Sequence, residues 1–380
     1  MTGRERIEAA LSPEGSPEIP AVICYEGIYV RDHWGGLTGL PWWYREAPDV
    51  GRQLQWREEV LPRIGQDWFD LPSCLPRRER DRLSIVERPD GVFLRDGRVG
   101  REHRLEEPVV GGWPRAGGGA AMRVPDPPLS ADEVDRRVPD PDPRTGGGIR
   151  SAGEADLADA LLGGAASTLL PVESVDSPFW GCYRLWGFEE LMVAVARSPG
   201  LVQHACARIL AQEIAAVRHA AARGARAIWV EECLADSIDP ASWSRIAAPP
   251  VEALIREIHA QGMAAVHYWC GDPSDRWDRL LGLGADAIAL EEGKKGFTID
   301  VEEVVDRVGG RMCVFGNLDA ITLLEHGSDA ELEREIARQL RAGRRNGGRF
   351  VMSIGSPVTP GTTPERVGRY LGIAHELGCR

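Results

Sequence analysis

The sequence predicts a single α/β domain over residues 1–380, a (β/α)8 barrel of the TIM type with an N-terminal extension and a Gly/Pro-rich insertion. From about residue 151, short apolar runs alternate with longer stretches of helical period, which predicts repeated strand–helix units. These runs lack the polar alternation of a solvent-exposed sheet, so we expect a parallel sheet covered by helices. No Gly-x-Gly-x-x-Gly segment follows the first strand, which argues against a dinucleotide-binding open sheet.

The first 110 residues are expected to hold one buried strand and a hairpin. Residues 19–24 form a short apolar run, and residues 83–87 and 92–95 flank the turn sequence Pro-Asp-Gly. The next stretch, 111–148, is rich in Gly and Pro and cannot hold a long helix or a central strand. We expect it to be a surface excursion, either a flap or an insertion, with one helical turn at 130–133.

The remaining elements follow one another in the order expected of a barrel. A capping residue followed by proline marks helix starts at Asp239 and Thr363. The two prolines at 249–250 divide the stretch 240–260 into two helices. The expected barrel strands are 168–172, 227–230, 264–267, 287–290, 313–315 and 350–353.

Composition excludes several classes of protein. The chain has 45 Lys and Arg against 58 Asp and Glu, a formal net charge of −13, which argues against nucleic acid or an anionic membrane as the main partner. No apolar run approaches the ~20 residues needed to span a bilayer, and the first residues lack the apolar core of a secretory signal. The eight cysteines are too dispersed for a disulfide scaffold. We therefore expect a cytoplasmic protein.

Polar residues follow five consecutive predicted strands. The carboxyl ends of barrel strands carry the chemistry in TIM-barrel enzymes, so this face is predicted to form a functional pocket. The residues concerned are Glu231, Glu232 and Cys233, then His267, Tyr268, Trp269 and Cys270, then Glu291 and Glu292, then Asn317 and Asp319, and finally Ser356.

A metal site is one hypothesis for this face. Cys233, His267 and Cys270, with Glu231 or Glu232, are residue types that bind zinc. His267 and Cys270 are three positions apart, so an undistorted strand would point them to opposite sides, and they meet only if the chain bends there. The alternative is that both cysteines are packed thiols and that the histidine is hydrogen-bonded inside the barrel.

Acid–base chemistry is a second hypothesis. One carboxylate of each pair, 231–232 and 291–292, is expected to face the pocket, where a neighbouring Lys294 or Lys295 would tune its pKa. The alternative is a solvated Glu–Lys pair on the loop rim. The candidate catalytic residues are Glu231, Glu232, Glu292, Tyr268 and Asn317.

Tryptophan is unusually frequent, with 12 residues against 7 Phe and 6 Tyr. Much of this set is expected to be core, but several tryptophans fall in loops near the predicted active face. An aromatic wall suits a small planar or apolar substrate. Asp319 is placed either to contact substrate or to cap the next helix. The candidate substrate contacts are Tyr25, Arg31, Trp34, Trp180, Trp269, Asp319 and Ser356.

Four segments resemble the uroporphyrinogen decarboxylase superfamily. They are TGRERIEAAL followed by IPAV near the start, CGD at 270–272, FGNLD at 315–319 and SIGSPVTPGTTPE at 353–365. The resemblance implies a single (β/α)8 barrel. It also implies one of two chemistries, because the superfamily contains decarboxylases and cobalamin-linked methyltransferases.

The local motifs resemble the methyltransferase branch more closely. Uroporphyrinogen decarboxylases carry an arginine-rich R-Q-A-G-R-Y segment after the first strand, whereas residues 25–32 here contain the single arginine Arg31. The methyltransferases have an H-x-C-G motif and a late cysteine; this chain has HYWCG at 267–271 and Ser356 at the late position. The resemblance implies zinc and, because no D-x-H-x-x-G motif is present, a corrinoid carried by a separate protein.

Three functional hypotheses result. The first is a methyltransferase or demethylase that moves a methyl group between a small molecule and a corrinoid protein, with zinc activating the leaving atom. The second is a cofactor-free decarboxylase in which Arg31, Arg184 and Lys294 hold the substrate carboxylate. The third is a non-catalytic ligand-binding barrel. A homodimer is compatible with all three.

Overall fold

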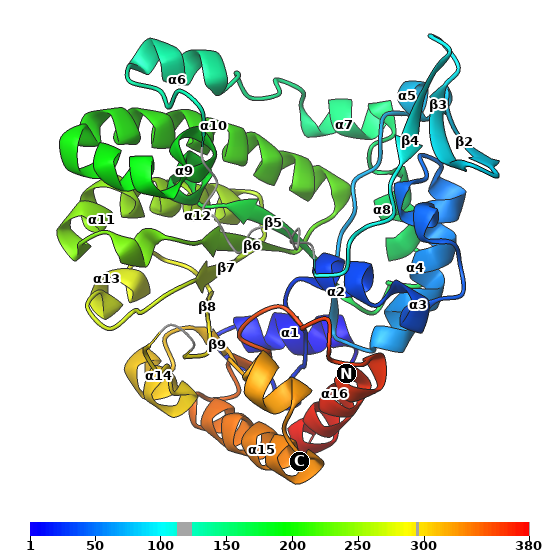
Figure 1. The fold of residues 1–380 in the computed structure, drawn as a ribbon. Helices are drawn as coiled ribbons and strands as arrows, with labels where there is room; N and C mark the ends of the chain where they lie inside the picture. Colours follow the sequence, from blue (N-terminus) through cyan, green and yellow to red (C-terminus); the bar gives the residue numbers. More distant parts are fainter. Residues whose placement is uncertain (112–123, 294–295, 380) are drawn as a thin grey trace.

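The computed structural model describes residues 1–111, 124–293 and 296–379. Within them, a seven-stranded parallel sheet curls around a common axis in the order β1-β5-β6-β7-β8-β9-β10, and helices cover its outer face (Figure 1). The strands are β1 Trp68–Asp70, β5 Leu170–Asp176, β6 Ala227–Glu232, β7 Ala264–Trp269, β8 Ala287–Leu290, β9 Cys313–Phe315 and β10 Phe350–Val351.

The segment 20–23 closes the sheet between β10 and β1. The Val22 amide donates to the carbonyl of Met352 at 2.9 Å, and the Asp67 amide donates to the carbonyl of Ala21 at 3.0 Å. Ala21 and Met352 form an isolated parallel bridge. The apolar run expected as the first strand therefore takes the position of the eighth strand of the barrel. The predicted (β/α)8 barrel is confirmed.

Helices occupy most of the chain between the strands. The N-terminal helices are α1 Gly3–Leu11, α2 Glu26–Asp32, α3 Trp34–Leu37, η1 Trp42–Glu46, α4 Val50–Ile64 and α5 Arg77–Arg80. The middle helices are α6 Ala131–Arg137, α7 Gly146–Ala152, α8 Asp156–Leu162, α9 Pro178–Arg197, α10 Pro199–Arg223, η2 Ala235–Ser237, α11 Pro240–Ile246 and α12 Ala248–Ala260. The C-terminal helices are α13 Trp277–Leu281, α14 Val301–Val308, η3 Ala320–Glu325, α15 Asp329–Arg345 and α16 Pro364–Gly378.

Local sequence signals set several helix boundaries as predicted. The Asp239 carboxylate accepts the amide of Ser242 at the start of α11, and Thr363 caps α16 in the same way. Ala247 separates α11 from α12, so the prolines at 249–250 fall in the first turn of the second helix, where proline is tolerated. Within the described residues, no helix is both long and apolar enough to cross a membrane.

Three strands extend beyond their predicted ends, and β5 continues to Asp176 although its end was predicted at 172. The sequence placed strand ends at 230 and 267, but β6 continues to Glu232 and β7 to Trp269, with Glu231 opposite Tyr268 in the parallel register. Because side chains alternate along a strand, this extension decides which predicted site residues face the barrel interior. β1 was not predicted at all, since its three residues are too short a run to stand out.

Aromatic rings fill the barrel interior. Trp229 of β6 stacks on Tyr268 of β7 with 4.9 Å between ring centroids, and Phe315 of β9 lies 5.9 Å from Trp229. Trp68 of β1 approaches both Trp229 and Phe315. The odd-numbered residues of β6 and the even-numbered residues of β7 therefore face inward, and the alternate residues face the helices.

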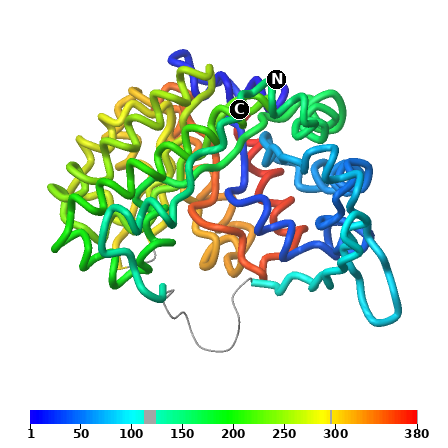
Figure 2. Tube along the Cα trace, turned by 90° about the horizontal axis from the view of Figure 1, so that it is seen from above, coloured from blue at the N-terminus to red at the C-terminus, as the bar shows by residue number. Residues whose placement is uncertain are grey.

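A small antiparallel sheet projects from the barrel. It consists of β2 Leu83–Arg88, β3 Gly91–Asp96 and β4 Arg101–Leu105. Arg88 pairs with Gly91 across the turn, which confirms the predicted hairpin, and the sheet extends away from the barrel body in Figure 2.

The described part of the Gly/Pro-rich segment runs over α10 (Figure 1). Residues 112–123 lie outside the described residues. Ser130 caps α6 at the predicted helical turn, and Val134 is the buried residue of this helix. The Trp186 indole donates to the Pro128 carbonyl at 3.1 Å, which ties the segment to α9.

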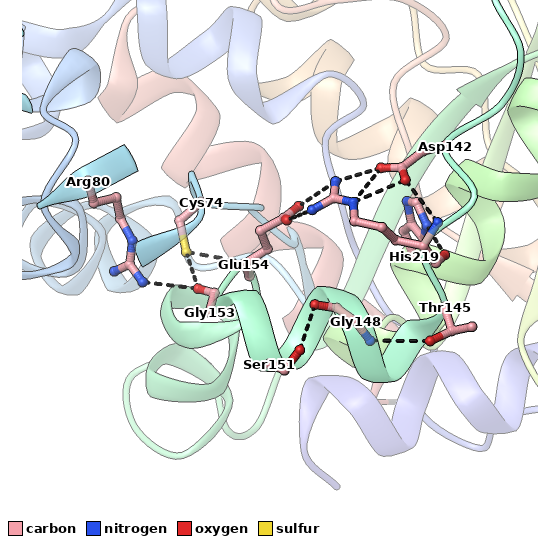
Figure 3. Close-up of polar contacts among 10 residues, drawn as sticks. Cys74, Arg80, Asp142, Thr145, Gly148, Ser151, Gly153, Glu154 and His219 are labelled. Atoms are coloured by element: carbon pink, nitrogen blue, oxygen red, sulfur yellow. Dashed lines mark hydrogen bonds and ion pairs between the residues drawn. The ribbon is translucent and has the colours of Figure 1, made fainter. Parts of the chain in front are cut away.

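Polar contacts hold α7 between the N-terminal region and α10 (Figure 3). The Cys74 thiol and the Arg80 guanidinium both donate to the carbonyl of Gly153, at 3.2 and 3.1 Å. His219 of α10 lies 3.0 Å from the carbonyl of Arg144. This region borders a surface hollow of about 760 Å³ that reaches Gly224, directly before β6, and so lies at the amino ends of the strands.

Candidate active site

A pocket of about 240 Å³ lies at the carboxyl end of β1 and beside the middle of β5 and β6. This is the end of the barrel at which TIM-barrel enzymes carry their chemistry. Its lining is mostly apolar and aromatic, with one carboxylate. The lining residues are Cys24, Tyr25, Gly27, Ile28, Trp68, Asp70, Val172, Ser174 and Trp229.

Three aromatic rings set nearly at right angles form the walls. The Trp229 ring is inclined by 81° to Trp68 and by 74° to Tyr25, with centroids 5.8 and 6.4 Å apart. Tyr25 precedes α2 with φ 57° and ψ 54°, a left-handed conformation that costs a non-glycine residue about 1–2 kcal/mol. Packing of its ring against Trp229 and Tyr268 offsets that strain and fixes the ring at the pocket.

Asp70 supplies the carboxylate of the pocket. It is the last residue of β1, and its Oδ2 accepts the amide of Gly27 at 3.1 Å. Asp70 is exposed to solvent, and desolvation by the surrounding concave wall raises its pKa to about 6; the Gly27 amide and Arg57 oppose this rise, and Glu173 adds to it. A carboxyl group with this pKa changes its protonation near neutral pH, as acid–base residues do.

Glu26 lies directly behind Asp70. Its Oε2 accepts the Gln66 amide at 2.7 Å and the backbone amide of Asp70 at 3.4 Å. Burial, together with the neighbouring charge of Asp70, raises the pKa of Glu26 well above its usual range. The negative charge of Asp70 therefore disfavours the ionised form of Glu26 behind it.

A group of polar side chains lies beyond Tyr25. The Cys233 thiol donates to Glu231 at 3.4 Å, and the Cys270 thiol lies beside that of Cys233 and raises its pKa. Burial raises the pKa of Glu231, while hydrogen bonds from Cys233 and Tyr25 lower it. Cys233 and Cys270, the two cysteines predicted as metal ligands, thus lie together next to Glu231. The chain bends after β7, and this bend brings Cys270 to Cys233.

His267 lies on the opposite face of β7. Its Nε2 is 2.7 Å from Oε2 of Glu232, whose other oxygen accepts the indole N–H of Trp243 on α11 at 3.0 Å. Both partners are almost completely buried between sheet and helix. The structure therefore does not bring His267 to Cys233 and Cys270, and the described residues contain no group of three His, Cys, Asp or Glu side chains that could hold a metal ion.

The two aromatic candidates on β7, Trp269 and Tyr268, lie on opposite faces of the strand. Trp269 faces outward with His267 and packs edge-on against Trp243, 5.4 Å between centroids, away from the pocket. Tyr268 faces inward, and its hydroxyl donates to the carbonyl of Gly355 at 3.1 Å. Tyr268 thus supports Trp229 from within the barrel.

A second hollow, of about 630 Å³, collects three other candidates outside the barrel, beside α15. Glu292 accepts the hydroxyl of Ser356 at 2.8 Å, and Asn317 donates to the carbonyl of Ile299 at 2.8 Å. Asp319 caps η3 by accepting two backbone amides, which is the capping alternative predicted for it. These residues join the loops after β8, β9 and β10, and they do not line the aromatic pocket.

The loop tryptophans also pack elsewhere. Trp34 donates its indole N–H to the carbonyl of Leu40 at 2.6 Å, and Trp180 stacks on Tyr183 within α9. The aromatic wall predicted from the composition exists, but Trp68 and Trp229 build it.

The cations proposed for carboxylate binding have other partners. Arg31 binds Asp32 at 2.7 Å, and Arg184 binds Asp176 on the edge of the barrel. Lys294 lies outside the described residues. Among the described residues that line the aromatic pocket, none is lysine or arginine.

Sequence reasoning missed Asp70, Trp68 and Trp229. The segment DWFDLP at 67–72 carries the available signal, a short apolar run that ends in an acidic residue before Leu-Pro. The sequence predicted that Trp229 lies in a strand. It did not predict that the side chain of Trp229 points into the barrel.

A closed parallel barrel with an aromatic and acidic pocket at the carboxyl ends of its strands is typical of TIM-barrel enzymes. The model of the uroporphyrinogen decarboxylase (URO-D) family matches residues 118–377, and the chain belongs to this family.

Curated relatives and a solved structure extend this finding. Uroporphyrinogen decarboxylase of Xanthomonas euvesicatoria is 26% identical over 212 residues, covering 52% of this chain and 58% of the relative. That of Azotobacter vinelandii is 27% identical over 163 residues, 41% of this chain and 43% of the relative. The chain thus spans 58% of the length of the first of these relatives and 43% of the second. A methyltransferase from Methanosarcina mazei shares the fold over 99% of both chains, with a TM-score of 0.61 and 16% identity.

Proposed function

We propose that this protein is a methyltransferase or demethylase that moves a methyl group between a small molecule in the aromatic pocket and a corrinoid carried by a separate protein. The observation that carries the proposal is the pocket itself: about 240 Å³, walled by aromatic rings, with no lysine or arginine among its described lining residues. A substrate with several carboxylates needs cationic partners. The activity named for the Methanosarcina mazei neighbour agrees with this proposal.

The pocket residues have distinct roles in such a reaction. The rings of Tyr25, Trp68 and Trp229 exclude water from the methyl group and hold it in one orientation. Asp70 faces the same space, and its pKa of about 6 lets Oδ2 hold or release a proton near neutral pH. We assign Asp70 to the heteroatom from which the methyl group departs.

Zinc, which the resemblance implied, stays a prediction. Cys233 and Cys270 lie together, but His267 is bonded to Glu232 on the other face of β7, so these three residues do not fit one metal ion. No step above depends on a metal. Stoichiometric zinc in the purified protein that disappears in both Cys233→Ala and Cys270→Ala would support the ion; its retention in both variants would contradict these ligands.

Methyl transfer is tested with purified protein, methylated small molecules and reduced cob(I)alamin, whose methylation changes its absorbance. We expect transfer that requires protein and that falls at least tenfold in Asp70→Asn. Asp90→Asn, in the exposed hairpin turn, is the matched control and should keep full activity. Release of CO2 from uroporphyrinogen without corrinoid would instead establish a decarboxylase. Ligand binding without turnover would establish a binding barrel.

A further inference from the structure

We propose that the group bound by the aromatic pocket is a methylated ammonium cation, so that the substrate is a small tertiary or quaternary ammonium compound. This inference rests on the proposed function, since the ammonium nitrogen is the atom that carries the transferred methyl group.

Ring geometry is the first argument. A cation is attracted to the faces of aromatic rings, and Trp is the strongest of these partners. The Trp229 ring stands nearly perpendicular to both Trp68 and Tyr25, so these rings bound the pocket from different directions. They come from β6, β1 and the start of α2, and their mutual packing fixes the cage before a ligand arrives.

Charge is the second argument. Asp70 lines the pocket, while Glu231 is hydrogen-bonded to Tyr25 on its far side. Arg57, whose charge acts on Asp70, lies over the Trp56 ring at 4.0 Å and donates to Gln53, so it is engaged on the α4 side of Asp70. A neutral apolar ligand would remove water from the Asp70 carboxylate without pairing it, whereas a cation pairs with it.

Size and reaction balance agree. The volume of about 240 Å³ lies below the ~300–1,000 Å³ of sites for drug-sized ligands and suits a small headgroup. In the transfer, the methyl carbon forms a bond to the reduced corrinoid and its bond to nitrogen breaks. The bonding pair returns to nitrogen, so a quaternary ammonium leaves as a neutral tertiary amine. The amine is uncharged when it forms and becomes an ammonium again only after it takes up a proton from solvent.

A matched pair of ligands tests the inference. Choline carries a trimethylammonium group, and 3,3-dimethylbutan-1-ol is its neutral isostere. We expect choline, titrated against the tryptophan fluorescence of the full chain, to bind at least tenfold more tightly than the alcohol. In Asp70→Asn the choline affinity should fall about tenfold and the alcohol affinity should not change. Equal affinities for the two ligands in the wild-type protein would overturn the inference, even if the variant failed to fold.

The failure of this inference is distinguishable from failure of the proposed function. If the protein demethylates a neutral methoxy compound with cob(I)alamin but does not bind choline, the cation cage is wrong and methyl transfer stands. If choline binds with the expected selectivity but no methylated ammonium compound transfers its methyl group, the cage stands as a binding site and the methyltransferase proposal fails.

Discussion

At the scale of single residues, Asp70 shows how position gives a common side chain a special property. It ends β1 at the wall of the pocket, where desolvation by the surrounding wall raises its pKa to about 6. The charged and titratable groups that face it are Glu26 from α2, Arg57 from α4 and Glu173 from β5. As pH falls through about 6, Asp70 takes up a proton and the pocket loses this negative charge.

This property predicts a pH dependence of ligand binding. A raised pKa means that Asp70 is ionised above about pH 6 and protonated below it, so attraction for a cation is present at pH 7.5 and lost toward pH 5. Choline affinity measured by fluorescence should fall as pH passes through 6. The affinity of Asp70→Asn should be lower and nearly flat over the same range. A wild-type affinity that is constant from pH 5 to 7.5 would show that Asp70 carries no charge relevant to binding.

At the scale of secondary-structure elements, the chain formed by His267, Glu232 and Trp243 joins β7, β6 and α11. Glu232 accepts both of its partners with carboxylate oxygens in a fully buried environment. Removing the carboxylate leaves a buried ring N–H and an indole N–H without partners, and unsatisfied buried groups are costly.

We therefore predict that Glu232→Ala lowers the free energy of unfolding by about 3 kcal/mol. Urea denaturation followed by circular dichroism measures this, with exposed Glu87→Ala on β2 as the control that should change stability little. His267→Ala should also destabilise the fold, and choline binding by the folded fraction should be kept. If His267→Ala left stability intact but removed a bound metal, the residue would be a ligand after all.

The same elements explain how far the sequence could be read. Helix boundaries depend on neighbours in the chain, so Asp239, Thr363 and the 249–250 pair predicted them correctly. The direction of a side chain depends on where a strand ends. Because β7 stays extended to Trp269, His267 alternates with the inward-facing Tyr268 and points outward; its spacing from Cys270 had already signalled that difficulty.

The pocket was harder to predict because its walls come from distant parts of the chain. Tyr25, Trp68 and Trp229 meet only when the barrel closes, and neither the three residues of β1 nor the left-handed backbone of Tyr25 has a strong local signature. Composition showed an excess of tryptophan, but only pairing of β1 with β5 and of β5 with β6 decides which rings face inward.

At the scale of the whole molecule, the barrel is closed by the short segment 20–23, called the seam below, rather than by a long strand. The segment 20–23 carries one isolated bridge to Met352, and the side chain of Asp67 supplies much of its attachment on the other side. Asp67 Oδ2 accepts the amide of Ala21 at 2.7 Å and lies 2.9 Å from Nε2 of His375 on α16. Its other oxygen pairs with Arg6 of α1. A single buried carboxylate thus joins α1, the segment 20–23 and α16.

This arrangement predicts that Asp67 controls closure of the barrel. Asp67→Ala removes one charge-assisted bond to Ala21, the partner of His375 and one of the two carboxylate partners of Arg6, so it should lower the free energy of unfolding by about 3 kcal/mol. Asp67→Asn keeps one acceptor oxygen for the Ala21 amide and should cost less. Hydrogen exchange should speed up at 21–23 and along β10, while the amides of β6 and β7 on the far side of the barrel stay protected. Because Tyr25 follows the seam directly, choline affinity should fall together with this protection. Uniform acceleration across all strands would instead show that the barrel opens as one cooperative unit and that the seam has no separate weakness.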